Sequence, residues 1–337
     1  MFDIAVIGAT GLVGEAIISI LEERRFPVRK LYALASHRSE GKTVLFKNKN
    51  ILVEDLAQFD FTKVQIALFS AGSAVSEKYV PQAVAAGAIV IDNTSYFRLE
   101  PDVPLVIPEV NSECIANVHD RGIIANPNCS TIQMLVALKP LYDAVGISRI
   151  NVATYQAVSG TGRTAITELI EQVGQLLNGK AIDPKVYPKQ IAFNVLPHCD
   201  SRQENGYTRE EMKMFWETQK ILNDPDIMVN ATAVRVPVLY GHSEAINLET
   251  IQKISAAEAK EILYKAPGII VLDEDGVDGY PTPIPEASGT DAVFVGRIRD
   301  DFTHPFGLNL WVVADNVRKG AALNAVQIAE ILVSQYL

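Results

Sequence analysis

The chain has 337 residues, 48% of them hydrophobic and 21% charged, which is enough for two globular domains with sizeable cores. Its net charge of −10 argues against nonspecific binding to nucleic acid or to an anionic membrane, although a locally basic site for an anionic substrate remains compatible with it. No apolar run reaches transmembrane length, and the first residues enter a strand without a basic leader, so we expect a cytoplasmic protein.

The cysteine usage predicts reduced thiols. Cys114, Cys129 and Cys199 are widely spaced and odd in number, which does not suit a disulfide framework. No C-x-x-C spacing suggests zinc, and we expect no metal site.

The chain begins with a pattern typical of dinucleotide binding. A strand over 2–7 runs into Gly8-Ala9-Thr10-Gly11-Leu12-Val13-Gly14, and apolar residues then recur at helical spacing. Glycines at such a turn let the backbone approach a pyrophosphate, whose charge is stabilised by the helix N-terminus. The alternative is a tight strand-to-helix turn with no ligand. The spacing is G-x-x-G-x-x-G and indicates a variant of the Rossmann fingerprint.

The loop after the second strand indicates which cofactor is bound. An enzyme that selects NAD usually places an acidic residue at the end of this strand. Here the expected strand over 30–35 ends in Ser36-His37-Arg38-Ser39, whose hydroxyls and guanidinium suit a 2′-phosphate. We therefore predict NADP, with an ordinary polar loop as the alternative.

The rest of the first half predicts a parallel, doubly wound sheet. A strand over 66–70 is followed by Ala71-Gly72-Ser73 and a helix over about 75–86, and a strand over 89–91 leads into a loop that contains Arg98. In such sheets ligands bind at the carboxyl ends of the strands. Ser70, Ala71 and Gly72 are thus further candidates for cofactor contact. Arg98 could reach an anion or could be a solvated surface arginine.

The stretch over 126–131, Asn-Pro-Asn-Cys-Ser-Thr, is the centre of the prediction. It ends a strand-like run over 122–125 and opens an apolar helical run over 132–138. Cys129 is therefore expected at or near a helix N-terminus, where free N–H groups and the macrodipole favour a thiolate. The alternative is a small buried cysteine that packs like alanine.

The second half no longer alternates strands and helices regularly, and it predicts an α+β domain with a largely antiparallel sheet. Strands are expected over 149–158, 233–238, 245–248, 292–295 and 308–313, and helices over 166–177 and 209–222, followed by an apolar last helix over 321–337.

Cys129 needs a proton-transfer partner. His242 lies in a Gly-His-Ser turn after an apolar strand, where functional histidines are common. His198 is a weaker candidate for this role. It is adjacent in sequence to Cys199, and side chains adjacent in sequence seldom face each other productively.

Three charged residues are candidates for binding anions or for ordinary ion pairing. Arg235 lies inside an apolar strand, where its charge must be paired or must bind something. Glu210 and Lys213 have the i,i+3 spacing that places them on one helix face, which usually means a solvated ion pair.

A cysteine, a histidine and an NADP domain together suggest one type of reaction. A thiolate adds to an aldehyde, hydride leaves to the nicotinamide, and an acceptor resolves the thioester. With phosphate as the acceptor the product is an acyl phosphate.

These motifs resemble the bacterial type of aspartate-semialdehyde dehydrogenase over essentially the whole chain. The matches lie at residues 8–14, 35–42, 69–72, 92–98, 126–133, 155–160, 210–213, 235–243 and 314–322. The resemblance implies NADP-dependent, reversible reductive dephosphorylation of L-aspartyl 4-phosphate to L-aspartate 4-semialdehyde and inorganic phosphate. This step leads to lysine (through diaminopimelate), threonine, methionine and isoleucine.

The resemblance also assigns roles to residues. Cys129 would be the thioester nucleophile, His242 the acid/base and Gln156 the residue that orients the substrate. The amino-acid end would be held by Arg235 and Glu210, and phosphate by Arg98, Asn128 and Lys213. Contacts to NADP would come from Thr10 to Val13, Arg38, Ser39, Ser159, Gly160 and Asn316.

The family fold implies an NADP-binding domain over 1–127 and 316–337, and a glyceraldehyde-3-phosphate-dehydrogenase-like catalytic and dimerisation domain over 128–315 that forms a homodimer. Two rival functions remain at this stage. A sister enzyme, N-acetyl-gamma-glutamyl-phosphate reductase, uses the same cysteine chemistry on a longer acyl phosphate. A non-catalytic NADP-binding sensor belongs to a different class.

Overall fold

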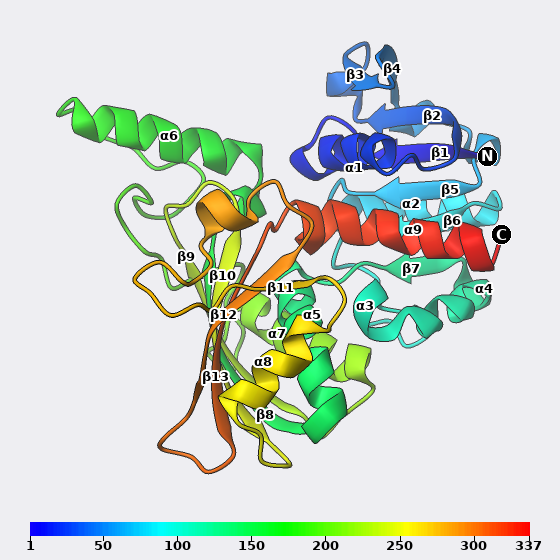
Figure 1. The fold of residues 1–337 in the computed structure, drawn as a ribbon. Coiled ribbons are helices and arrows are strands. Elements are labelled where there is room, and N and C mark those ends of the chain that lie inside the picture. The colour runs from blue at the N-terminus through cyan, green and yellow to red at the C-terminus, as the bar shows by residue number, and fades with distance from the viewer. The chain divides into compact units, whose positions relative to one another are not determined.

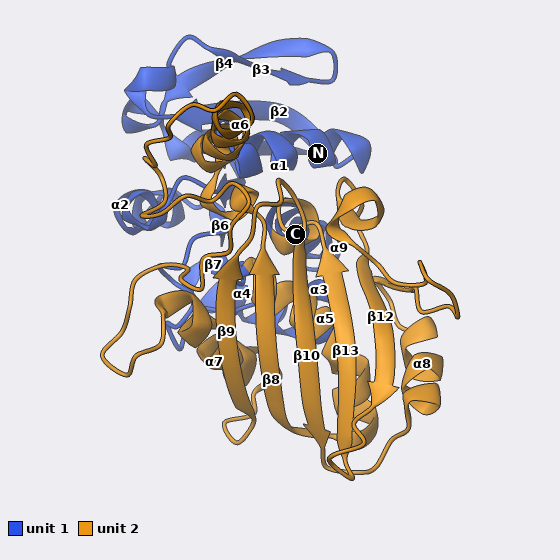
Figure 2. Ribbon diagram, turned by 90° about the vertical axis from the view of Figure 1, so that its left-hand side faces the viewer, with its two compact units in different colours: residues 1–128, 321–337 blue, residues 129–320 orange.

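The computed structural model describes residues 1–337, and the chain divides into two compact units (Figure 2). Unit 1 comprises residues 1–128 and 321–337, and unit 2 comprises residues 129–320. Each unit has its own sheet, one Rossmann-type and the other part of an α+β arrangement, so the predicted fold class is confirmed.

The sheet of unit 1 has the order β3-β4-β2-β1-β5-β6-β7 and is parallel from β4 to β7 (Figure 1). Its strands are β1 (Phe2–Ile7), β2 (Val28–Ala35), β3 (Thr43–Phe46), β4 (Lys49–Asp55), β5 (Ile66–Phe69), β6 (Ile89–Asp92) and β7 (Ile123–Ala125). The chain passes from β1 to β2 on one side and later to β5 on the other. The carboxyl ends of β1 and β5 therefore form the topological switch point, where such sheets bind ligands.

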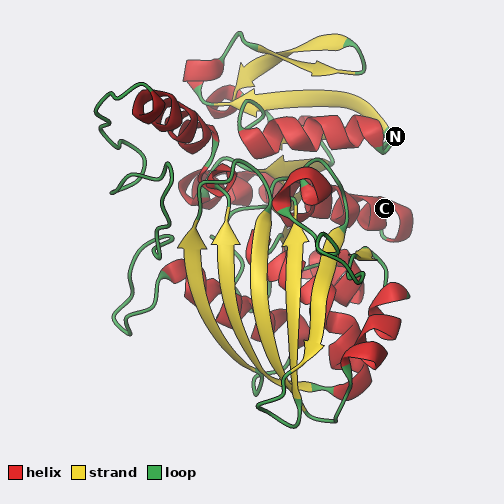
Figure 3. Cartoon of the chain, turned by 60° about the vertical axis from the view of Figure 1, so that its left-hand side comes forward, coloured by secondary structure: helices red, strands yellow, loops and turns green.

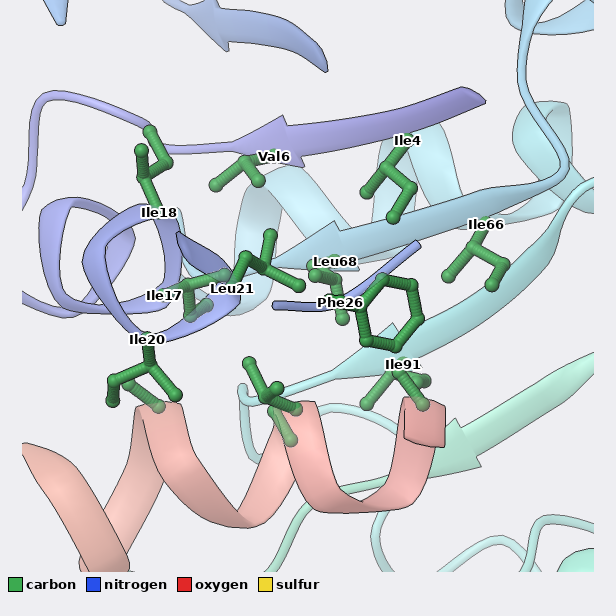
Figure 4. Close-up of a cluster of buried hydrophobic side chains, with 14 of the residues drawn as sticks. Ile4, Val6, Ile17, Ile18, Ile20, Leu21, Phe26, Ile66, Leu68 and Ile91 are labelled. Atoms are coloured by element: carbon green, nitrogen blue, oxygen red, sulfur yellow. The ribbon is translucent and has the colours of Figure 1, made fainter. Parts of the chain in front are cut away.

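Two helices that are distant in sequence share the core of unit 1. Figure 4 shows Ile17, Ile20 and Leu21 of α1 (Leu12–Glu23) packed with strand residues such as Val6 and Leu68. The C-terminal helix α9 (Leu323–Gln335) adds its own apolar side chains to the same cluster. The remaining helical segments are α2 (Ser73–Ala85), α3 (Pro108–Asn111), α4 (Val118–Arg121), η1 (His37–Ser39), η2 (Leu56–Gln58), η3 (Phe61–Lys63) and η4 (Ser112–Asn117).

The sheet of unit 2 has the order β11-β12-β13-β10-β8-β9. Its strands are β8 (Ile147–Gln156), β9 (Met228–Arg235), β10 (His242–Thr250), β11 (Ile269–Val271), β12 (Val293–Asp300) and β13 (Gly307–Ala314). The three central pairings are antiparallel, whereas β8 pairs with β9 and β11 with β12 in parallel. The expected largely antiparallel sheet is thus confirmed, with one parallel pairing at each edge. The physical reason at the β9 edge is the long connection over 157–227, which returns the chain in the same direction.

Helices cover one face of this second sheet and leave the other open (Figures 2 and 3). The covering helices are α5 (Cys129–Val145), α7 (Arg209–Leu222) and α8 (Ala256–Tyr264). The remaining helical segments are α6 (Arg163–Leu177), η5 (Val158–Thr161), η6 (Pro283–Ala287) and η7 (Arg318–Ala322). Along β10 the even-numbered residues are buried beneath the helices, and the odd-numbered ones from Ala245 onward lie on the open face.

None of the helices combines the length and the apolar character that a membrane crossing requires.

Candidate active site

Cys129 is the first residue of α5, as the sequence predicted, and its side chain is half-buried. The helix N-terminus provides the partial positive charge that favours an anionic sulfur. The backbone of Gly320 passes directly over it, because a Cβ added to Gly320 would lie 2.9 Å from the Cβ of Cys129. Burial raises the pKa of Cys114 above its usual value and that of Cys199 to about 11. Cys129 is therefore the cysteine best placed to react.

Gln156, at the end of β8, connects α5 with α7. Its side chain is buried, and its Nε2 donates to Ser130 Oγ at 3.1 Å and to Glu210 Oε1 at 3.3 Å. A further acceptor, Thr154 Oγ1, lies at 3.3 Å. These contacts hold the Gln156 carboxamide beside the residue that follows Cys129.

The predicted pairing of Glu210 and Lys213 is present in α7. Lys213 Nζ lies 2.9 Å from Glu210 Oε2 and 2.8 Å from Asp200 Oδ2. Burial by itself lowers the pKa of Lys213, but the two carboxylates outweigh it and raise the pKa above its usual value. Lys213 is thus a firmly charged cation that already has two anionic partners.

His242, the first residue of β10, is fully buried, whereas its rival His198 is exposed. Its Nδ1 accepts a hydrogen bond from the backbone N–H of Ala157 at 3.0 Å. Burial, followed by the positive charge of Arg235, lowers the pKa of His242 to about 3. The ring is therefore neutral at physiological pH and carries its proton on Nε2, which has no partner within the chain.

Arg235, the last residue of β9, is buried and lies close to His242. Its Nη1 donates to the backbone carbonyl of Ala157 at 2.8 Å, and its Nε is buried without a partner. A Cβ added to Gly160 would lie 2.8 Å from this Nη1 and 3.2 Å from His242 Nε2. The guanidinium and the imidazole thus meet at one glycine, with unused N–H donors on both.

Asn316 connects three loops of unit 2. Its Oδ1 accepts from Ser159 Oγ at 3.0 Å and from the backbone N–H of Gly241 at 3.0 Å. This places Ser159, Gly160 and Asn316, all predicted cofactor contacts, around the segment that leads into His242.

In unit 1, the glycine-rich loop lies at the switch point. Gly8 has φ +84°, and a Cβ added to it would lie 3.0 Å from atoms of Ser70 at the end of β5. A Cβ added to Gly14 would lie 2.1 Å from the carbonyl oxygen of Gly8. Only glycine fits at Gly14, so the first turn of α1, with Gly11, Leu12 and Val13, packs closely on the loop. Ala71 and Gly72 follow β5 at the same edge.

The predicted 2′-phosphate loop meets the glycine-rich loop. Thr10 Oγ1 lies 3.4 Å from Ser39 Oγ, which joins segments that are 29 residues apart. Arg38 is exposed in the short turn η1, directly after Ser36. Beside it, His37, Glu40 and Asp55 place potential ligand atoms within 4.8 Å of one another, but the group is largely exposed.

Arg98 and Asn128 complete the predicted residues of unit 1. Arg98 is buried and donates from Nη2 to the backbone carbonyl of Asn93 at 2.8 Å. Asp92 shapes this loop by accepting from the backbone N–H of Thr94 at 2.9 Å. Asn128 is buried directly before Cys129.

Two features of the site were not predicted from the sequence. Ser130 was quoted as part of a motif, but its hydrogen bond with Gln156 was not expected. Ala157 serves the site through its backbone alone, with its N–H on His242 and its carbonyl on Arg235. A backbone role of this kind leaves no signal in the residue type.

Comparisons with known proteins define the class first. Residues 3–118 match the family model "Semialdehyde dehydrogenase, NAD binding domain", and residues 138–319 match "Semialdehyde dehydrogenase, dimerisation domain". The chain is thus an oxidoreductase with a nucleotide-binding domain and a dimerisation domain.

Individual relatives identify the family within this class. The aspartate-semialdehyde dehydrogenase of Legionella pneumophila is 63% identical over 335 residues, covering 99% of this chain and 96% of the relative. The crystal structure of aspartate semialdehyde dehydrogenase II from Vibrio cholerae, complexed with ASA, has a TM-score of 0.98 at 56% identity and covers 100% and 99% of the two chains. The Candida albicans enzyme with NADP has a TM-score of 0.76 at 27% identity and covers 99% and 98%. The chain belongs to the aspartate-semialdehyde dehydrogenase family, whose members act in amino-acid biosynthesis.

Proposed function

We propose that the protein catalyses the reversible, NADP-dependent conversion of L-aspartyl 4-phosphate into L-aspartate 4-semialdehyde and phosphate, through a thioester on Cys129. The step would supply lysine (through diaminopimelate), threonine, methionine and isoleucine synthesis. The observation that carries the proposal is the convergence of Arg235 Nη1 and His242 Nε2 at Gly160, in the unit whose helix α5 begins at Cys129.

Cys129 acts as the nucleophile. In the reductive direction its sulfur attacks the acyl carbon of aspartyl phosphate, the C–O bond to phosphate breaks, and a thioester remains. NADPH, when bound, supplies the hydride that reduces this thioester. The resulting hemithioacetal releases the aldehyde when its C–S bond breaks and the thiolate re-forms.

His242 acts at the oxygen of the reacting carbonyl. Its neutral ring presents Nε2–H, so it donates a hydrogen bond to the negative charge that develops on this oxygen and serves as the acid/base of the site. Gln156 orients the same acyl group, since its carboxamide is fixed beside Ser130.

The amino-acid end of the substrate is held by Arg235 and Glu210. The buried Nε of Arg235 has no partner in the chain, and a carboxylate would satisfy it through a two-point contact. Glu210 is buried nearby in the Gln156 network and provides an acceptor for the ammonium group.

Phosphate is held by Arg98, Asn128 and Lys213. Lys213 Nζ has three N–H donors, and two of them serve Glu210 and Asp200, which leaves one for phosphate. The Asp200 side chain is 34% exposed, against 9% for Glu210, so its carboxylate is the more accessible neighbour of an incoming phosphate.

The residues of unit 1 fit NADP. The glycines at Gly8 and Gly14 let the loop pack closely on Ser70 and on the first turn of α1, and the N-terminus of that helix can then bind a pyrophosphate at the switch point. Thr10, Ser36 and Ser39 provide hydroxyls next to the exposed guanidinium of Arg38, which suits a 2′-phosphate. Binding of NADP by the Candida albicans relative supports this choice. Ser159, Gly160 and Asn316 would contact the nicotinamide half.

A second copy of the chain is the proposed protein partner. The match to a dimerisation domain covers most of unit 2, and its sheet has one face without helices (Figure 2). Tyr155 and Trp311 lie together on this face, with ring centroids 5.5 Å apart. We infer a homodimer in which the two open faces pack together.

A phosphate-dependent assay tests the reaction. The protein with aspartate semialdehyde, NADP and phosphate should form NADPH, and omission of phosphate should abolish steady turnover. N-acetyl-glutamate semialdehyde, the substrate of the sister enzyme, should be used poorly. Absence of NADPH formation with intact cofactor binding would instead indicate a non-catalytic sensor.

Arg38→Ala tests the choice of cofactor. A charge-assisted contact with the 2′-phosphate is about twice as strong as a neutral one, so its loss should weaken NADP binding and leave the poorer binding of NAD nearly unchanged. Lys63→Ala, at another surface position of unit 1, is the control and should change neither. Equal losses for both cofactors would show that Arg38 does not contact the 2′-phosphate.

A further inference from the structure

Glu244 is a fully buried acid that the proposed mechanism does not use. It lies in β10, two residues after His242, on the side of the sheet that the helices cover. Its neighbours across the sheet are Thr154 of β8 and Val312 of β13. No ion pair reaches it, and neither carboxyl oxygen has a hydrogen bond of ordinary geometry. An isolated buried carboxylate is very costly, so its presence here needs an explanation.

Gln133 provides the polar group that acts on Glu244. It lies in α5, one helical turn after Cys129, and is also fully buried. Its Nε2 lies 3.4 Å from the backbone carbonyl of His242, and its Oε1 has no partner. The Gln133 amide partly offsets the effect of burial, which nevertheless raises the pKa of Glu244 well above its usual value.

Counting donors and acceptors indicates how the two side chains are satisfied. Gln133 offers two N–H donors and an oxygen acceptor. One N–H serves the carbonyl of His242, and the second can donate to the C=O of Glu244. The remaining acceptor, Gln133 Oε1, needs an O–H donor, which Glu244 can provide only when it carries a proton. A carboxylate at this position would leave Gln133 Oε1 buried and unpaired.

We propose that Glu244 is a positioning residue: as an uncharged carboxylic acid it pairs with the Gln133 carboxamide and holds that amide against the backbone carbonyl of His242. Gln133 is four residues from Cys129 in α5, and Glu244 is two residues from His242 in β10. The acid–amide pair therefore ties the helix of the nucleophile to the strand of the histidine. This role rests on the function proposed above for Cys129 and His242.

Vibrational spectroscopy tests the protonation state without turnover. At neutral pH the infrared spectrum of the protein should contain the C=O band of a protonated carboxylic acid. Asp92 is a second buried acid whose pKa is raised by burial, so the Glu244 band is isolated as the difference between the spectra of the wild type and Glu244→Gln. Absence of a carboxylic-acid band from this difference spectrum would overturn the proposal.

Kinetics test the positioning role. Glutamine presents an N–H donor and a C=O acceptor where a protonated glutamate presents its O–H and C=O, so Glu244→Gln should keep the pairing with Gln133 and hold kcat within about twofold. Glu244→Leu leaves Gln133 unpaired and should lower kcat about tenfold with unchanged KM values. Gln133→Leu should have the same effect. The double variant Glu244→Leu/Gln133→Leu should be no slower than either single variant, because each of the three proteins loses the same interaction.

Val312→Ala is the control for packing, since it removes only apolar atoms beside Glu244. It should lower the Tm and leave kcat unchanged. The positioning role of Glu244 would be refuted if Val312→Ala, or Glu244→Gln, lost as much kcat as Glu244→Leu. If Glu244→Leu does not fold, Glu244→Asp replaces it in this test. Aspartate keeps the carboxyl group but is too short to reach Gln133, so Glu244→Asp should lose kcat about tenfold while Glu244→Gln stays active. A wild-type protein with no activity on aspartate semialdehyde would refute the proposed function, and the infrared test would still decide the state of Glu244.

Discussion

Ala157 holds His242 in one tautomer: its backbone N–H donates to Nδ1 at 3.0 Å and directs the proton of the neutral ring to Nε2. The carbonyl of the same residue accepts from Arg235 Nη1 at 2.8 Å. One residue after the end of β8 thus orients both the imidazole and the guanidinium, and any shift of this backbone should disturb both.

Gly160→Ala should disable the site. The added Cβ would lie 2.8 Å from Arg235 Nη1 and 3.2 Å from His242 Nε2, so one of the two side chains has to move. A displacement of this size should lower kcat/KM about a hundredfold. The backbone of Gly160 has no positive φ, so the fold itself should tolerate alanine.

The matched control is Gly174→Ala in α6, where an added Cβ meets nothing within 4 Å. It should retain activity and stabilise the helix by about 0.5–1 kcal/mol. Full activity of Gly160→Ala would show that Arg235 and His242 are less tightly placed than the structure indicates.

Burial of His242 should make the protein less stable in acid. Its pKa is about 3 in the folded chain and about 6.5 in the unfolded chain, so below about pH 6.5 only the unfolded state takes up the proton. The free energy of unfolding should therefore decrease as the pH falls from about 6.5 towards about 3, by about 1.4 kcal/mol per unit.

Urea unfolding of the wild type and of His242→Gln checks this expectation. Between about pH 7.5 and about pH 5.5 the wild type should lose about 1.4 kcal/mol more than the variant. Parallel losses in the two proteins would mean that His242 is protonated to the same extent in the folded and unfolded states.

Arg235→Lys should separate the two anion sites. The lysine keeps the charge but loses the planar fork that can bind a carboxylate through two parallel hydrogen bonds. The KM for aspartate semialdehyde should rise tenfold to a hundredfold, about 1.5–3 kcal/mol, while the KM for phosphate changes little. Steady-state kinetics with each co-substrate varied in turn would measure both. Equal effects on the two KM values would argue against a dedicated carboxylate contact.

Lys213 and Asp200 should affect phosphate in opposite directions. Lys213→Ala removes the proposed phosphate contact and should mainly raise the KM for phosphate, about tenfold. Asp200→Asn removes a carboxylate charge, 2.8 Å from Lys213 Nζ, that repels phosphate, and should lower this KM. An unchanged phosphate dependence in both variants would place the phosphate away from α7.

Sequence patterns predicted the buried framework better than the exposed and polar parts. The strand over 2–7 coincides with β1, because its apolar run over 4–7 ends at a glycine that the turn requires. The hairpin of β3 and β4 was not predicted, since its exposed strands have no clear apolar pattern and its turn uses Lys47 and Asn48 at positive φ. Helix α8 was also missed, although Ser255 and Glu258 form a capping box that the sequence displays.

The helix at the nucleophile shows where pattern and structure differ. The apolar run over 132–138 indicated its centre, but α5 extends from Cys129 to Val145 and accommodates Pro140 in its interior. Strand β9 ends at Arg235, so the expected strand over 233–238 is too long at its far end, where Pro237 lacks the N–H that a ladder needs.

Among the polar residues, Cys129 and His242 could be selected because their local turns are distinctive. Glu244 could not, because an acid in a strand is ordinarily exposed, and only the packing of α5 on β10 shows that this one is buried.

The central claim, a thioester on Cys129, is tested most directly by mass spectrometry of the protein after acid quenching. Incubation with aspartate semialdehyde and NADP in the absence of phosphate should form about one NADPH per active site and leave an acyl adduct on the peptide that contains Cys129. Cys129→Ala should bind NADP normally and form neither product, whereas Cys114→Ala and Cys199→Ala should form both. An adduct on another residue, or appreciable turnover by Cys129→Ala, would contradict the mechanism.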